Sequence, residues 1–170
     1  MRALVVLFLL IFSCSASAAP SYHMNSIMLM QPEKIFGDRV GSAEKLSDYI
    51  IALNGAAERT LSAESSPNPA AGFIVVAVRP GGKSKVWIDF SPAVPLALEA
   101  RLLGSLQAVT PVSVNGGVIV FAINASLWDA APTSQQSPQV AEWQQAVKQA
   151  GKPLEVGDIV DRVWSSEKSR

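Results

Sequence analysis

The triplet Gly82-Lys83-Ser84 follows an apolar stretch and matches the last residues of the phosphate-binding loop, whose lysine and serine contact phosphates and their magnesium ion. That loop also needs a glycine five residues before Gly82, where this chain has Ala77. It further needs a helix after the serine, because the free amides of a helix N-terminus hold the phosphates. Residues 85–90 (KVWIDF) have the composition of a β-strand instead. We therefore expect a turn here and no nucleotide site.

A second pattern, Ser42-x-x-Lys45, has the spacing of the nucleophile and base of penicillin-interacting enzymes. Those enzymes also need Ser-Asp-Asn and Lys-Thr-Gly elements. The nearest match to the first is Ser47-Asp48-Tyr49, which differs in its third residue, and the chain contains no Lys-Thr-Gly. The same spacing recurs at Ser165 and Lys168, near the end of the chain. The pattern therefore indicates that Ser42 caps a helix rather than acts as a nucleophile.

His23 is the only histidine of the chain, and a metal site or a catalytic triad would need partners for it. The aspartates that could supply them are scattered along the sequence, at Asp38, Asp48, Asp89 and Asp129. We therefore expect a solvated or half-buried His23, no bound metal and no cofactor. A hydrolase that uses a pair of carboxylates, such as Asp89 and Asp129, stays open as an alternative, because such a pair is defined by its separation in space.

A possible binding surface lies on the strand expected at 85–90, where alternation places Trp87 and Asp89 on one face and the other apolar side chains on the opposite face. An outward tryptophan beside basic side chains makes a good contact point, because Trp and Arg are enriched at interface hot spots. The predicted binding residues are Trp87, Arg79, Lys83, Lys85 and Asp89. In the alternative arrangement, the C-terminal helices cover this face, and Trp143 and Trp164 pack over Trp87.

The elements that position these residues can be read from apolar periodicity and turn residues. Two strands, 72–79 and 85–90, flank the turn 80–84 and form a hairpin. The clearest helix begins at its cap Ser42 and runs to Leu61, with Asn54-Gly55 as a weak point. The remaining expected elements are a short strand within 21–30, a loop over 33–41, a helix over 95–106, a strand 112–114 that turns at 115–117 into a strand 117–123, a loop over 124–137, a helix capped by Ser137 and closed by Gly151, and a helix over 156–164.

This order of elements, β-α-β-β-α-β followed by two helices, predicts an α+β fold of the ferredoxin-like type. Its antiparallel sheet would carry helices on one face, with the two C-terminal helices appended. Another α+β sandwich with the same elements remains an alternative. Residues 19–164 are expected to form one domain, followed by a disordered tail over 165–170.

The N-terminus has the features of a secretory signal peptide. Arg2 precedes the apolar run 4–12 (LVVLFLLIF), and Ala16-Ser17-Ala18 forms a cleavage site of the A-x-A type. The apolar run is shorter than the ~20 residues that span a bilayer, so we expect cleavage after Ala18 and no membrane anchor afterwards. Lipidation of Cys14 is disfavoured, because bulky Phe12 stands where a small residue is needed. The protein is therefore expected to be periplasmic or secreted.

The mature chain would lose Cys14, the only cysteine, and would contain neither a disulfide nor a thiol nucleophile. Without Arg2, it would carry one more acidic than basic residue, which gives no indication of nucleic acid as a partner. These observations favour a small exported, non-enzymatic domain that binds an unknown envelope protein through protein–protein contacts. A carboxylate-dependent hydrolase of the cell envelope and a carrier of a small apolar ligand are the alternatives.

Overall fold

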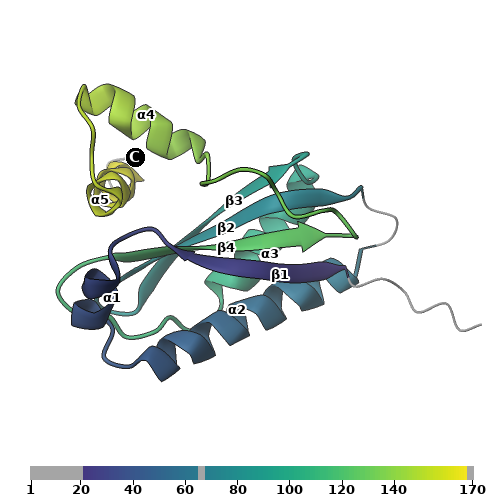
Figure 1. The fold of residues 1–170 in the computed structure, drawn as a ribbon, viewed down its shortest axis with the longest axis horizontal. Coiled ribbons are helices and arrows are strands. Elements are labelled where there is room, and N and C mark those ends of the chain that lie inside the picture. Colours follow the sequence, from purple (N-terminus) through teal and green to yellow (C-terminus); the bar gives the residue numbers. More distant parts are fainter. Residues whose placement is uncertain (1–20, 65–67, 168–170) are drawn as a thin grey trace, which may run out of the picture.

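A four-stranded antiparallel sheet with helices on both faces organises the computed structural model, which describes residues 21–64 and 68–167 (Figure 1). The predicted α+β class is thus confirmed. The elements are β1 (Tyr22–Leu29), α1 (Glu33–Arg39), α2 (Ala43–Ser62), β2 (Ala70–Arg79), β3 (Lys83–Ser91), α3 (Leu96–Gln107), β4 (Ile119–Leu127), α4 (Ala141–Ala150) and α5 (Val156–Glu167). The predicted signal peptide lies outside the described residues.

The strands lie in the order β1-β4-β2-β3, and every neighbouring pair is antiparallel. The ferredoxin-like order is not confirmed, because that arrangement places the first and third strands at the centre as a parallel pair. Here β2 and β4 are central, and almost all of their side chains are buried on both faces. β1 and β3 carry more polar and exposed side chains and lie at the edges. Strands that are apolar on both faces thus take the positions that are covered on both sides.

Helices α2 and α3 cover one face of the sheet and enclose the larger core (Figure 1). Helix α2 begins at Ser42, whose Oγ accepts a hydrogen bond from the backbone N–H of Lys45 at 3.3 Å, so the predicted cap is confirmed. Its apolar stripe buries Leu53 and Leu61 completely, and Leu102 of α3 is buried beside them. They pack against the side chains of β2 and β4 that point to this face, namely Ile74, Val76, Val78, Ile119, Phe121 and Ile123.

Helices α4 and α5 cover the opposite face and enclose a second core (Figure 1). Val160 of α5 is completely buried, and Trp143 of α4 is 7% exposed. The strand residues beneath them are Phe73, Val75, Ala77, Trp87, Val120 and Ala122. The sheet is therefore covered by helices on both faces, rather than on one face with an appended arm.

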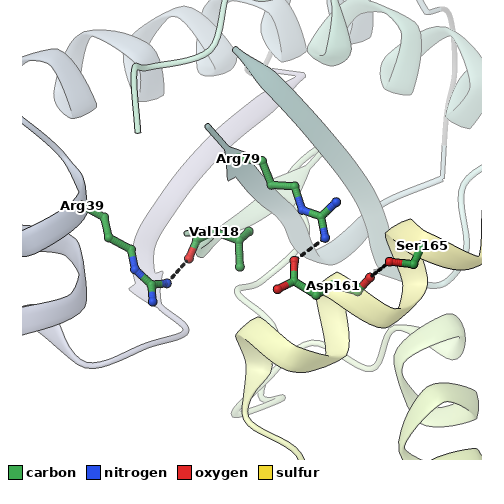
Figure 2. A network of polar contacts seen from close by, with 5 residues as sticks. All are labelled: Arg39, Arg79, Val118, Asp161 and Ser165. Carbon is green, nitrogen blue, oxygen red and sulfur yellow. Dashed lines mark hydrogen bonds and ion pairs between the residues drawn. The ribbon is translucent and has the colours of Figure 1, made fainter. Parts of the chain in front are cut away.

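Two local predictions differ from the structure. Residues 33–39, expected as a loop, form the short helix α1, which starts after Pro32 with Glu33 in its first turn. Residues 112–114, expected as a hairpin strand, form only an isolated bridge, between Val114 and Val40. The guanidinium of Arg39 lies against Gly117, where an added Cβ would be 2.9 Å from its Cζ. It donates to the carbonyl oxygen of Val118 at 2.6 Å (Figure 2).

The ends of the last three elements also differ from those expected. Strand β4 continues four residues beyond Ile123, to Leu127. Helix α4 begins at Ala141 without a side-chain cap, so the predicted cap at Ser137 is wrong, whereas Gly151 closes the helix in the left-handed conformation as expected. Helix α5 extends through Glu167.

Because the chain has one cysteine, it forms no internal disulfide. Within the described part of the chain, no helix is long and apolar enough to cross a membrane.

Candidate functional site

Trp87, the centre of the predicted binding surface, lies beneath α4 and is 7% exposed. Its indole meets that of Trp143 edge to face, with ring centroids 5.3 Å apart and an interplanar angle of 79°. Its Nε1–H donates a hydrogen bond to Oε2 of Glu142 at 2.9 Å. Of the two arrangements considered for this face, the structure has the covered one.

Arg79, at the end of β2, contacts α5 at two points. Its guanidinium pairs with the carboxylate of Asp161, which points towards it from α5, as Figure 2 shows. The same guanidinium lies over the indole of Trp164, with Cζ 4.3 Å from the ring centroid. Asp161 and Trp164 lie three residues apart on the helix and so share one face of it. Arg79 therefore fixes α5 to the sheet through charge and through a stacked ring.

The other predicted binding residues divide into two groups. Lys85 lies 5.1 Å from the ring centroid of Trp87, and its Nζ is 3.4 Å from Oε2 of Glu142. Asp89 accepts a hydrogen bond from the backbone N–H of Gln139 at 2.6 Å, just before α4. Lys83, in contrast, is exposed at the start of β3. Four of the five predicted residues thus contact the chain's own C-terminal segment, where acidic side chains of α4 and α5 meet basic side chains of the β2–β3 hairpin.

The residues considered for nucleotide binding or catalysis include the glycine turn, Asp129 and His23, which lie in different parts of the fold. Gly81 and Gly82 have positive φ angles of 84° and 68° in the tight turn between β2 and β3, so the turn expected there is confirmed. Asp129 is exposed in the turn after β4, where φ is 62°. His23 is exposed on β1. Among the described residues, no group of three or more His, Cys, Asp and Glu side chains is placed to hold a metal ion.

A groove of about 840 Å³ lies between α4 and α5. Its lining is largely polar and includes charged side chains of both signs, such as Glu142, Lys152, Asp158 and Arg162. A smaller groove, of about 400 Å³, lies along α4 beside Trp143 and Val147. A carrier of an apolar ligand needs an enclosed apolar cavity, and neither groove has that form.

The two edge strands of the sheet differ sharply in chemistry. Edge strand β3 contains Lys83, Lys85 and Asp89, and charged side chains on an edge oppose pairing with other chains. Edge strand β1 (YHMNSIML) contains no charged residue and no proline. Its large apolar side chains are partly exposed: Met24 is 37%, Ile27 41% and Leu29 40% exposed. Figure 1 shows β1 at the margin of the sheet, next to β4. Within the described residues, β1 therefore lacks the charged side chains and the proline that protect many edge strands.

Two side chains hold β1 in place. Asn25 is the extra residue of a β-bulge between Met24 and Ser26, and its Nδ2 donates to Oδ1 of Asn124 and to Oγ of Ser126, at 3.0 and 2.9 Å. The Tyr22 hydroxyl donates to Oδ1 of Asn54 on α2 at 2.6 Å. Burial raises the pKa of Tyr22, and the charge of nearby Glu58 raises this pKa further. β1 is thus fixed to the sheet along one side, and its outer side is left as an edge.

Sequence reasoning missed β1 as a candidate site because its apolar run resembles a strand buried in the core. The available signal was the absence of charge and proline from residues 21–30, which becomes informative only once the strand is known to lie at an edge. Asn54, which with Gly55 was expected as a weak point of α2, accepts a hydrogen bond from the Tyr22 hydroxyl. Comparisons with known proteins gave no match, since no protein-family model, no curated protein and no solved structure matches this chain.

Proposed function

We propose that this protein is an exported, non-enzymatic binding protein of the cell envelope that acts through protein–protein contacts at the edge of β1. Export is supported by the N-terminal sequence, in which a short apolar run precedes the Ala16-Ser17-Ala18 cleavage site. N-terminal sequencing of the protein recovered from the periplasm or the medium tests this part. A mature chain that begins at Ala19 is expected, and an uncleaved chain in the cytoplasm would refute it.

The observation that supports the binding function best is the contrast between the two sheet edges. A strand from a partner adds to a sheet through backbone hydrogen bonds, and side chains on both strands provide selectivity. β1 offers eight residues without charge or proline, and three partly exposed apolar side chains. The Trp87 face, the other candidate surface, is occupied by α4 and α5. β1 is thus the better candidate for contact with another protein.

The experiment compares two isoleucine-to-lysine variants that add the same charge at different places. Ile27→Lys places a charge on the edge strand, whereas Ile51→Lys places it on the exposed side of α2, where Ile51 is 64% exposed. Proteins crosslinked to a photoreactive residue at position 27 are identified from the native envelope, purified and tested for direct binding. We expect Ile27→Lys to weaken that binding at least about tenfold, and Ile51→Lys to leave it unchanged. Equal binding by all three proteins would refute a role for β1.

A further inference from the structure

We infer that the partner strand at this edge is β1 of a second copy, so that two sheets join into one continuous sheet about a two-fold axis. This inference rests on the proposed function of β1 as a strand-binding edge. It adds the identity of the partner, which the edge alone does not specify.

The regular part of β1 sets where the two copies can pair. The bulge at Asn25 interrupts the ladder, so regular pairing with β4 runs from Ser26 to Leu29 and continues with a hydrogen bond from the N–H of Met30 to the carbonyl oxygen of Val120 at 3.0 Å. A two-fold axis at Met28, the middle of this segment, places Met28 opposite Met28 of the second copy and so fixes the partner of every other residue. Because the strands are antiparallel, Ile27 then lies opposite Leu29 of the second copy.

This register matches the exposed side chains to each other. Ile27 and Leu29 point to the same face of the sheet, since residues two apart on a strand share a face. They are 41% and 40% exposed, so each has apolar surface left to bury. The two-fold axis creates this Ile–Leu contact twice, and apolar cross-strand pairs stabilise antiparallel strands. The edge is therefore complementary to itself.

Charge does not oppose this association. Residues 22–29 contain no Asp, Glu, Lys or Arg, so the two paired strands themselves bring no like charges together. The whole chain has 14 basic and 14 acidic residues, and proteins with a net charge near zero associate more readily than strongly charged ones. The β3 edge, with two lysines and an aspartate, has the protected chemistry that β1 lacks.

The first test measures the mass of the purified mature protein by light scattering and by sedimentation over a range of concentrations. We expect a dimer for the unaltered protein and for Ile51→Lys. We expect Ile27→Lys to raise the dimer dissociation constant roughly 100-fold, because the two-fold axis introduces the lysine twice. Circular dichroism must show the same fold for all three proteins.

A second test determines the register through disulfides. The mature chain lacks Cys14, so any introduced cysteine is unique. Ile27→Cys mixed with Leu29→Cys should form a disulfide-linked dimer on mild oxidation. Either variant alone should crosslink poorly. In this register, position 27 of one copy lies two residues, or about 7 Å along the strand, from position 27 of the other, and the spacing between the strands adds to that distance. A disulfide needs its two Cα atoms within about 7 Å. Equal crosslinking by each variant alone would refute this register.

The outcomes separate the two proposals. A monomer at every concentration, or a dimer that Ile27→Lys leaves intact, overturns the pairing of two copies. If the protein is monomeric but Ile27→Lys still abolishes binding to a crosslinked envelope protein, then the proposed function stands with a different partner. If Ile27→Lys changes neither self-association nor partner binding, then both proposals fail.

Discussion

The guanidinium of Arg79 lies over the indole ring of Trp164, 4.3 Å from its centroid, and so joins the end of a central strand to the last helix. The neighbouring ion pair with Asp161 acts on the same helix face. The side chain of Arg79 is 22% exposed, so water screens these contacts less than at an open surface. Arg79 thus has a larger structural role than its place beside a surface turn suggests.

Replacing Arg79 with alanine should therefore destabilise the protein. We expect Arg79→Ala to lower the free energy of unfolding by about 1–2 kcal/mol, through loss of the cation–π contact and the ion pair. Lys83→Ala removes the same charge from the same hairpin but from an exposed position, and should change it by less than about 0.5 kcal/mol. Urea unfolding measures both. Equal effects of the two variants would contradict the assigned role of Arg79.

Gly72 should tolerate no side chain. A Cβ atom at this position would lie 2.0 Å from the carbonyl oxygen of Asp89, which belongs to the backbone of the paired strand. We expect Gly72→Ala to lower the free energy of unfolding by at least about 3 kcal/mol, or to prevent folding, because the β2–β3 backbones would have to separate.

The matched control for this change is Gly104 in α3, where an added Cβ meets no atom within 4 Å. Gly104→Ala should raise the stability by about 0.5–1 kcal/mol, because alanine loses less backbone entropy in a helix. Urea denaturation of both variants makes the comparison. A stable, soluble Gly72→Ala protein would show that the two strands lie farther apart than described.

The two tyrosines of the chain should resist ionisation in the folded protein. Tyr22 is 8% and Tyr49 is 4% exposed, and burial raises the pKa of both hydroxyls. Because the pKa values of both hydroxyls are raised in the folded protein, ionisation of the tyrosines favours the unfolded chain. The free energy of unfolding is therefore unaffected by the tyrosines below their ordinary pKa of about 10, and it falls as the pH rises above that value. Ultraviolet absorbance should therefore show tyrosinate only as circular dichroism shows unfolding. Titration near pH 10 with the fold intact would contradict this expectation.

Local signals predicted much of the fold. The periodicity of residues 42–62, the hairpin with its glycine turn and the apolar run of β4 each identified the right type of element, because each depends on neighbours in sequence. The strand order could not be predicted in this way. β1 and β4 both have apolar runs, and only assembly shows that β4 is enclosed whereas Ile27 and Leu29 stay partly exposed.

The candidate site shows the same limit. Alternation along β3 correctly placed Trp87 and Asp89 on the face away from the larger core. Whether that face was open depended on Glu142 and Trp143, which lie more than 50 residues away in the chain and meet Trp87 only in the folded structure. Short-range patterns carry no information about such contacts. The same holds for the hydrogen bond from Arg39 to Val118, which lie 79 residues apart in the chain.

The central position of β4 has a consequence for the timing of folding. β4, the last strand in sequence, lies between β1 and β2 in the sheet. Its Ser126 pairs with His23 of β1, about a hundred residues earlier in the chain. The sheet therefore cannot close until synthesis has passed Leu127, and closing so long a loop slows folding. The N-terminal part alone leaves β1 without the strand it pairs with, so the proposed export would have time to take place before the sheet closes.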